Sequence, residues 1–269
     1  MTGLKAHYSA RDIETRILAA LRASGLDPEQ RLSPAELGAL DHFHTGGLRA
    51  SRELLELAQF RAGDRVLDVG AGLAGPARLI AATRGCRVDC LDMSPDFCAG
   101  AGLLNRLTGL GDRVVVHEGS ALAMPFPDDA FDVVWMQNVG MNIADKGTLY
   151  AEIRRILKPG GRFAFQDFVG GKSALSHFPL PWATDPADSF LVSAEEMRSL
   201  LGGSGFITEA FEDTSDAHLT ASIANATPAA AGQLSLAVFV DNLGQKARNA
   251  RLSLEEGQVR LVRGVFRAS

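Results

Sequence analysis

Residues 66–76, Val-Leu-Asp-Val-Gly-Ala-Gly-Leu-Ala-Gly-Pro, decide the fold that this sequence predicts. An apolar β-type run ends there in three glycines with the spacing G-x-G-x-x-G, and a pattern of helical period follows directly. This order predicts a strand, a tight turn and a helix whose first turn holds Pro76, where the missing N–H costs nothing. Glycines allow positive φ and let a ligand approach the backbone closely, so the turn is a candidate ligand site.

Two acidic residues near this turn indicate the kind of ligand. Asp92 lies 20 positions after Gly72, at the end of the next apolar run, where a carboxylate can accept hydrogen bonds from a ribose diol. Asp68 lies two positions before Gly70, where a carboxylate would repel the pyrophosphate of a dinucleotide. S-Adenosylmethionine has no phosphate and carries a sulfonium and an ammonium. Asp68 therefore favours S-adenosylmethionine over a nicotinamide coenzyme.

Strand and helix patterns alternate along the middle of the chain, which predicts a parallel sheet with helices on both faces. We expect an α/β, Rossmann-like sheet of seven mostly parallel strands, with the last strand antiparallel. The predicted strands are 65–69, 87–91, 113–117, 131–136, 162–168, one within 206–214 and the returning strand within 258–268. The predicted core helices are 76–84, 95–109, 146–157 and 194–202, and residues 158–162 (Lys-Pro-Gly-Gly-Arg) are predicted to form a turn.

Helical patterns also lie outside this alternation. They occupy 10–24, 32–40 and 49–60, and a later region of helical character spans 216–257. We interpret residues 1–269 as a single domain: a helical cover (1–60), a cofactor-binding core (61–168), a substrate loop (169–192) and the C-terminal part of the sheet (193–269) with the helical insertion 216–257. The loop is rich in Pro, Gly and Ser with interleaved aromatic residues, so it is predicted to be either a substrate lid or an ordered connector.

Composition excludes several classes of protein. The formal charge of −5 comes with no basic arm or stripe, which argues against nucleic-acid binding. No apolar run approaches the roughly 20 residues of a membrane span and no signal-peptide core is present, so we expect a cytoplasmic protein without membrane contact. Cys86, Cys90 and Cys98 are expected to be reduced packing residues, and no metal is expected. A homodimer is left open.

Four stretches together resemble the class I S-adenosylmethionine-dependent methyltransferases. They are VLDVGAGLAG (66–75), VDCLDMS (88–94), EGSALAMPFPDDAFDVVWMQNV (118–139) and LYAEIRRILKPGGRFAFQDF (149–168). The resemblance covers roughly residues 45–212 and is closest to the small-molecule branch with glycine-betaine-type N-methyltransferases and quinone C-methyltransferases. Residues 41–54 resemble the segment before the first strand in sarcosine/dimethylglycine-like members. The resemblance implies methyl transfer from S-adenosylmethionine to a small molecule, with S-adenosylhomocysteine as the product.

The same comparison implies where the methyl donor binds. We expect it at the carboxyl ends of the strands, where open α/β sheets bind ligands. Ser120 stands where the family commonly has an aspartate near the adenine, so this contact is expected to be weaker. The residues predicted to bind the cofactor are Asp68, Gly70, Ala71, Gly72, Asp92, Met93, Ser120, Ala121, Leu122, Gln137 and Asn138.

The acceptor and the catalytic groups are less strongly indicated. Predicted acceptor contacts are Phe43, Met141, Asn142, Phe178 and Trp182. An amine acceptor needs only to be neutral when bound, whereas a phenol, an acid or an enolisable carbon can require a base. Candidate bases are His44, His177 and Asp167. The histidines are alternatively surface or packing residues, and Asp167 is alternatively a strand-end carboxylate that makes backbone hydrogen bonds.

Several functions remain open at this point. The acceptor is predicted to be a small amine or amino acid or a natural-product-like metabolite. The alternatives are O- or C-methylation of an aromatic or quinone-type metabolite, and a protein that binds S-adenosylmethionine without turnover. A nucleic-acid methyltransferase is disfavoured, because Gln137-Asn138-Val139-Gly140 stands where amino-methylating enzymes that act on DNA carry D/N-P-P-Y/F.

Overall fold

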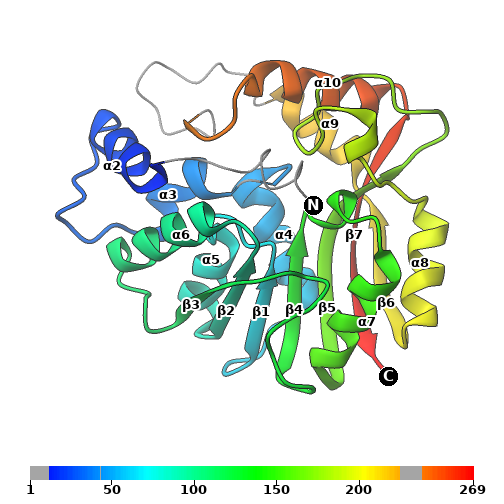
Figure 1. Cartoon of the computed structure of the whole chain (residues 1–269), viewed down its shortest axis with the longest axis horizontal. Helices are drawn as coiled ribbons and strands as arrows, with labels where there is room; N and C mark the ends of the chain where they lie inside the picture. The colour runs from blue at the N-terminus through cyan, green and yellow to red at the C-terminus, as the bar shows by residue number, and fades with distance from the viewer. Residues whose placement is uncertain (1–11, 43, 225–237) are drawn as a thin grey trace.

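The computed structural model describes residues 12–42, 44–224 and 238–269, and its centre is a seven-stranded sheet. The strand order is β3-β2-β1-β4-β5-β7-β6 (Figure 1). Neighbours from β3 to β5 pair in parallel, and β7 pairs antiparallel with both β5 and β6. The predicted α/β class, the seven strands and the antiparallel last strand are therefore confirmed.

The strands begin and end close to the predicted positions. They are β1 (Arg65–Val69), β2 (Arg87–Asp92), β3 (Val114–Glu118), β4 (Phe131–Gln137), β5 (Leu157–Gly170), β6 (Phe206–Asp213) and β7 (Val259–Ala268). Only β5 is much longer than expected. The turn predicted at 158–162 is wrong, because these residues lie in an irregular part of this strand. Phe131 pairs with Leu157 and Val133 with Arg162, so one residue of β4 between these pairs faces residues 158–161 of β5. Gly160 takes φ +75° in this segment, which explains why the sequence pattern is that of a turn.

Helices cover both faces of the sheet. On one face lie α4 (Gly47–Ala58), α5 (Gly75–Arg84) and α6 (Pro95–Leu107), which enclose a cluster with Ile80, Trp135 and Val265. On the other face α7 (Lys146–Ile156) and α8 (Ala194–Gly203) pack on a cluster with Tyr150, Phe163 and Phe266. Figure 1 shows α7 and α8 in front of the strands. The central strands β1 and β4 are mostly apolar because both of their faces are largely buried.

Two further groups of helices lie at the carboxyl ends of the parallel strands. Helices α2 (Ile13–Ala23) and α3 (Pro34–Asp41) form an apolar cluster with Leu73 and Phe97, which belong to the first two strand-to-helix connections. Helix α3 begins after Ser33, whose N–H donates a 2.7 Å hydrogen bond to the Glu36 carboxylate. The N-terminal helices therefore cover the end of the sheet at which the ligand was predicted.

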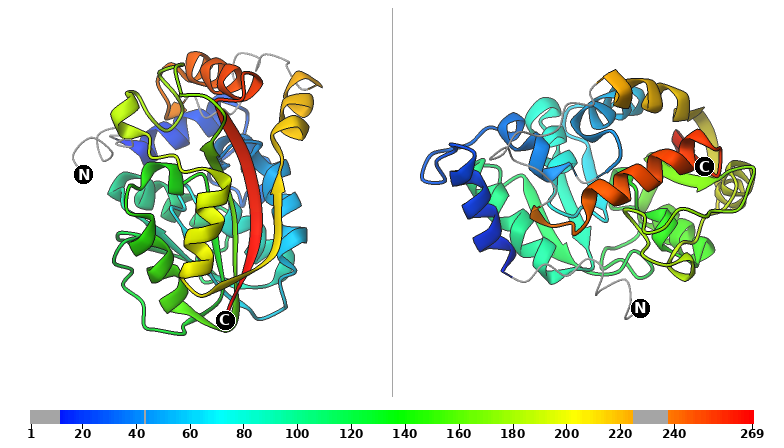
Figure 2. Two further views of the ribbon diagram at one scale, coloured as in Figure 1. Left: turned by 90° about the vertical axis from the view of Figure 1, so that its right-hand side faces the viewer. Right: turned by 90° about the horizontal axis from the view of Figure 1, so that it is seen from above.

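The region predicted as a helical insertion contains α9 (Ser215–Ala224) and α10 (Leu243–Glu255). Residues 225–237, and with them the apolar Leu234 and Leu236, lie outside the described part of the chain. Viewed from above in Figure 2, α10 crosses the end of the sheet. Its residues Ala250 and Leu254 pack with Phe168 at the end of β5 and with Trp182 of the 169–192 loop. Among the described residues, no helix combines the length and the apolarity needed to cross a membrane.

Candidate active site

The turn after β1 has the geometry predicted from its glycines. Gly70 takes φ +66° and Gly72 φ +53°, a region that side chains with a Cβ rarely adopt. A Cβ on Gly70 would lie 2.4 Å from a methyl carbon of Val139, whereas a Cβ on Gly72 would meet nothing within 4 Å. At Gly75 a side chain is excluded by the N-terminal cover, because a Cβ there would lie 2.4 Å from the carbonyl oxygen of Asp41. The three glycines therefore provide close packing, open space for a ligand, and contact with the N-terminal cover.

Backbone N–H groups of this turn are already engaged. Those of Gly70 and Ala71 donate to the Leu91 carbonyl at 2.7 and 3.2 Å, and that of Gly72 donates to the Asp92 carboxylate at 2.8 Å. A turn that binds a pyrophosphate instead presents free N–H groups to the anion. This turn offers none of these three donors to a phosphate.

The two acids of the turn differ in their surroundings. Both carboxylate oxygens of Asp92 accept backbone N–H groups, from Gly72 and from Ser94 at 2.9 Å, although burial still raises its pKa. Asp68 is buried, and its Oδ2 has no hydrogen-bond partner among the described residues. Burial, with the nearby Asp92 carboxylate as the second cause, raises the pKa of Asp68 to about 8. Asp68 is therefore mostly protonated at neutral pH while the site holds no cation.

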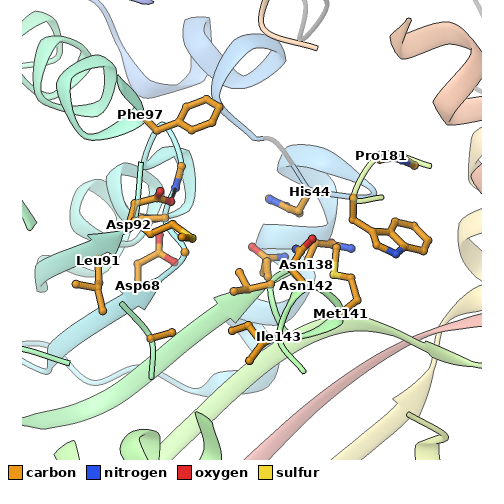
Figure 3. Close-up of a pocket in the computed structure, with 18 of the residues that line it drawn as sticks. His44, Asp68, Leu91, Asp92, Phe97, Asn138, Met141, Asn142, Ile143 and Pro181 are labelled. Atoms are coloured by element: carbon orange, nitrogen blue, oxygen red, sulfur yellow. Dashed lines mark hydrogen bonds between the residues drawn. The ribbon is translucent and has the colours of Figure 1, made fainter. Parts of the chain in front are cut away.

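A cavity of about 480 Å³ opens at the carboxyl ends of β1, β2 and β4, above this turn (Figure 3). It extends from Asp68, Asp92 and Phe97 past His44 and Asn138 to Pro181. Every residue predicted to bind the cofactor lines it: Asp68, Gly70, Ala71, Gly72, Asp92, Met93, Ser120, Ala121, Leu122, Gln137 and Asn138. The topology brings them together because parallel strands end at the same edge of the sheet.

The acceptor residues and bases predicted from the sequence are only partly brought to this cavity. Met141, Asn142, Trp182 and His44 line it. Phe178 packs in the apolar cluster beneath α10 and is not part of the cavity wall. His177 lies against Glu256, with 2.9 Å between Nε2 and Oε2, and does not line the cavity. Phe43 lies outside the described residues.

Asp167 lies beside the cavity wall rather than in it. It is fully buried, and one oxygen accepts the N–H of Phe168 at 2.9 Å. Burial raises its pKa to about 7, while the backbone N–H groups of Phe168, Met141 and Gly140 and the nearby Lys146 oppose the rise. Its second oxygen, Oδ2, has no hydrogen-bond partner among the described residues and lies against the short 3₁₀ helix η1 (Gly140–Asn142), where a Cβ on Gly140 would be 2.3 Å from it.

Lys146 joins this turn to the 169–192 loop, and the sequence did not indicate it. Its ammonium donates to three carbonyl oxygens, those of Gly140 at 2.8 Å, Phe190 at 2.7 Å and Ile143. The N–H of Phe190 in turn donates to the Met141 carbonyl at 2.9 Å. Two segments that line the cavity are thereby held together by a buried cation whose three donors are all satisfied.

His44 belongs to a buried hydrogen-bond network behind the cavity wall. Its Nε2 lies 3.0 Å from the Gly47 carbonyl oxygen and 2.9 Å from Ser51 Oγ. Ser51 Oγ donates to Gln137 Oε1 at 3.0 Å, and Trp135 Nε1 donates to the same oxygen at 3.0 Å. The nitrogen of that amide, Gln137 Nε2, is buried without a partner in the described part of the chain. Burial lowers the pKa of His44 to about 3, so its ring is neutral at physiological pH.

The His44 loop is attached to the sheet through its neighbour Thr45. The N–H of Thr45 donates to Asn138 Oδ1 at 3.2 Å, and its carbonyl accepts Gln166 Nε2 at 2.8 Å. Asn138 takes φ 55° just after β4, which places its side chain beside the loop. These contacts join the cover to the ends of β4 and β5 and hold His44 over the cavity.

Several further residues complete the wall, and the sequence predicted no role at the site for most of them. Trp182 stacks on Phe168 with ring centroids 4.5 Å apart and donates through Nε1 to Ser189 Oγ at 3.0 Å. The other lining residues that the sequence did not indicate lie on four separate segments, so no local sequence spacing connects them. Only for Phe190 was there a signal, the aromatic content of the 169–192 loop. These additional lining residues are Asp41, Phe97, Pro181, Asp188, Phe190, Val240 and Leu243.

The charge of the wall is one-sided. The described lining residues include five carboxylates and neither lysine nor arginine; the five are Asp41, Asp68, Asp92, Asp145 and Asp188. Asp41 is paired with the buried Arg78 at 2.7 Å, and Asp145 accepts the N–H and the hydroxyl of Thr148. No group of three or more His, Cys, Asp or Glu side chains suited to a metal ion occurs in ranges 12–42, 44–224 and 238–269.

The sheet order, the antiparallel last strand and a cavity at the glycine turn define a Rossmann-like domain with the methyltransferase arrangement of strands. Residues 67–165 match the family described as Methyltransferase domain. Residues 67–165 therefore form a domain of the class I S-adenosylmethionine-dependent methyltransferase type, as the motifs predicted.

Individual relatives differ in the acceptor that they are named for. A glycine/sarcosine/dimethylglycine N-methyltransferase of Actinopolyspora halophila is 39% identical over 110 residues, which are 41% of this chain and 20% of that protein. A sterol 24-C-methyltransferase of Eremothecium gossypii is 40% identical over 121 residues, 45% of this chain and 32% of that protein. The chain thus spans about a third or less of the length of these relatives.

A solved structure reproduces the fold over most of its length. A Galdieria sulphuraria protein whose structure is described as that of a sarcosine dimethylglycine methyltransferase superposes on this chain with a TM-score of 0.67 at 23% identity. The superposition covers 86% of this chain and 93% of that one. At this identity the likeness concerns the fold alone.

Proposed function

We propose that this protein transfers the methyl group of S-adenosylmethionine to a small molecule bound in the same cavity. S-Adenosylmethionine supplies an electrophilic methyl group on a sulfonium that is already a good leaving group. The chain's own task is then alignment of the acceptor and exclusion of water. The observation that carries the proposal is one continuous cavity that joins the glycine turn to an apolar wall formed by Met141, Phe168 and Trp182.

The residues around the turn suit a cationic nucleoside without phosphate. Asp68 Oδ2 is a buried acceptor without a partner, which a cationic ligand group would satisfy. The turn N–H groups are engaged internally, so a pyrophosphate would find no donors there. Both oxygens of Asp92 accept backbone N–H groups, and the carboxylate still has lone-pair capacity left for a ribose hydroxyl. A nicotinamide coenzyme fits these groups poorly.

The acceptor side suits a molecule with an apolar body and no negative charge. Its wall is made of Met141, Phe168, Pro181, Trp182 and Phe190. Without a cationic side chain among the described lining residues, a bound carboxylate would be desolvated near other carboxylates at a cost of several kcal/mol. Of the two acceptor classes predicted from the sequence, the natural-product-like metabolite therefore fits better than a free amino acid.

Binding of the product and transfer of label test the proposal separately. Calorimetry with S-adenosylhomocysteine should give one site per chain, and a variant with Asp92 replaced by alanine should bind more weakly. Methyl-labelled S-adenosylmethionine offered to a metabolite panel should label neutral, apolar members. Binding without any labelled product would instead support a protein that holds the nucleoside without turnover, and no binding would refute the proposal.

A further inference from the structure

We infer that His44 is the general base of the reaction and that the methyl acceptor is a hydroxyl group on an apolar aromatic scaffold. This inference rests on the proposed methyl transfer and adds the kind of atom that receives the methyl group. It starts from the hydrogen bonds of His44, which determine where its proton lies.

The network fixes the tautomer of His44. A carbonyl oxygen can only accept a hydrogen bond, so Nε2, 3.0 Å from the Gly47 oxygen, must carry the hydrogen of the neutral ring. Ser51 Oγ is then free to donate to Gln137 Oε1, as its 3.0 Å distance requires. Nδ1 is left as an unprotonated nitrogen with a lone pair. None of the described residues forms a hydrogen bond with it, and His44 lines the cavity.

The place of His44 suits contact with both substrates. In Figure 3 it lies over Asn138, between Asp68 and Asp92 on one side and Pro181 on the other. Asp68 and Asp92 belong to the proposed cofactor end, and Pro181 belongs to the apolar acceptor wall. A hydroxyl that approaches the methyl group between these two ends would pass beside the His44 ring.

No other described lining residue offers the same chemistry. His44 is the only histidine in that part of the wall. Asp68, once ionised, is paired with the cationic cofactor, and Asp92 accepts the backbone N–H groups of Gly72 and Ser94 at the cofactor end. Asp188 is exposed, so water competes for its carboxylate. Asp41 is paired with Arg78, Asp145 accepts the N–H of Thr148, and the rest of the wall is apolar, amide or hydroxyl in character, so an acceptor proton has no better destination.

The charge balance favours proton transfer to this ring. As the acceptor oxygen bonds to the methyl carbon, the carbon–sulfur bond breaks, and the sulfur keeps that electron pair as a neutral thioether. The hydroxyl proton moves to Nδ1, so one positive charge leaves the sulfonium and one appears on the imidazolium in the same cavity. Burial opposes a charged His44 when the site is empty. The carboxylates that stabilise the sulfonium of the bound cofactor also stabilise the imidazolium that forms as the sulfonium is neutralised.

An acceptor hydroxyl makes better use of this site than an acid or an amine would. A carboxylic acid is already ionised at neutral pH, needs no base, and meets a wall of carboxylates. An aliphatic amine is an ammonium at neutral pH, and it would have to be desolvated against the apolar acceptor wall before it could lose its proton. A phenol has an ordinary pKa near 10 and stays protonated until a base removes its proton. The combination of an aromatic wall and a neutral imidazole therefore points to phenol-type hydroxyls.

The test compares matched acceptors and variants. With labelled S-adenosylmethionine we expect product from 4-alkylphenols and little from the corresponding 4-alkylanilines and 4-alkylbenzoic acids. His44→Gln should lower kcat by about 100-fold to 10,000-fold, with the affinity for S-adenosylhomocysteine changed less than about threefold. His177→Asn is the control, because that histidine lies outside the cavity wall, and its turnover should equal that of the parent.

A measurement on the protein without substrates keeps the inference testable if the variant does not fold. Nitrogen-15 NMR of labelled histidines should show His44 with hydrogen on Nε2 and a bare Nδ1, and 4-ethylphenol added to the S-adenosylhomocysteine complex should shift the Nδ1 signal. A hydrogen on Nδ1, equal turnover of His44→Gln, or no product from any phenol would overturn the inference. If the product nucleoside binds and anilines alone are methylated, this inference fails while the proposed function stands. If the nucleoside does not bind, both fail.

Discussion

The raised pKa of Asp68 predicts that the affinity for S-adenosylmethionine increases with pH. Burial, followed by the Asp92 charge, raises the pKa of Asp68 to about 8 in the ligand-free protein. A ligand with an ammonium and a sulfonium binds the ionised carboxylate, so the protein must lose this proton to bind. The apparent affinity is therefore the intrinsic affinity of the ionised protein multiplied by the fraction of molecules in which Asp68 is ionised.

The expected size follows from that fraction. With a pKa of about 8, roughly one molecule in 100 is ionised at pH 6, one in 11 at pH 7 and one in two at pH 8. The dissociation constant should then fall about 50-fold from pH 6 to pH 8, and binding at pH 7 should release about 0.9 proton per site. Asp68→Asn has nearly the same shape and cannot ionise, so its dissociation constant should change less than about threefold over this range.

Isothermal titration calorimetry in two buffers of different ionisation enthalpy measures both quantities at once. The parent should show buffer-dependent heat at pH 7, and Asp68→Asn should not. Asp92 also has a raised pKa, and the comparison of the two proteins separates its contribution from that of Asp68. A flat affinity profile in the parent, or the same profile in Asp68→Asn, would refute the reasoning about Asp68.

Four further outcomes follow from the structure. Because the folded-state pKa of Asp68 lies above the unfolded value of 3.8, its protonated form contributes stability below pH 4 that is lost as the pH rises through about 8. Asp68→Asn should therefore gain stability over the parent between pH 4 and pH 8, as urea unfolding at several pH values will show. Asp92→Ala should weaken binding of S-adenosylhomocysteine by about 1–3 kcal/mol through lost charge-assisted hydrogen bonds; unchanged affinity in calorimetry would contradict the ribose contact. Gly70→Ala should lower the melting temperature far more than Gly72→Ala, since only the first Cβ meets Val139 at 2.4 Å, whereas Gly72→Ala should mainly weaken nucleoside binding; equal melting temperatures would count against this. Lys146→Met leaves three carbonyl oxygens without their donor and should reduce the free energy of unfolding by about 2–4 kcal/mol, with a raised KM for the acceptor and unaltered nucleoside affinity; a change confined to nucleoside binding would show that its contacts serve another purpose.

Residues near one another in the chain determined most of the cofactor end. A strand, a glycine turn and an acid after the next strand are local patterns, because hydrophobic period and backbone freedom depend on neighbouring residues. Sheet topology then brings Asp68, Gly72, Asp92 and Gln137 to one edge, since parallel strands all end there. For that reason every residue predicted from these motifs lies on the cavity wall.

Only the tertiary structure decided the acceptor end and the state of its ionisable groups. His44 reaches the cavity because Thr45 is held by Asn138 and Gln166, contacts between residues about 90 to 120 positions apart. The sequence alone offers Asp167 and His177 as equal candidates for a base. In the structure Asp167 is buried beneath η1, whereas His177 lies against Glu256. The neutral His44 and the protonated Asp68 likewise depend on burial, which no local pattern specifies, because solvent exclusion is produced by segments distant in the chain.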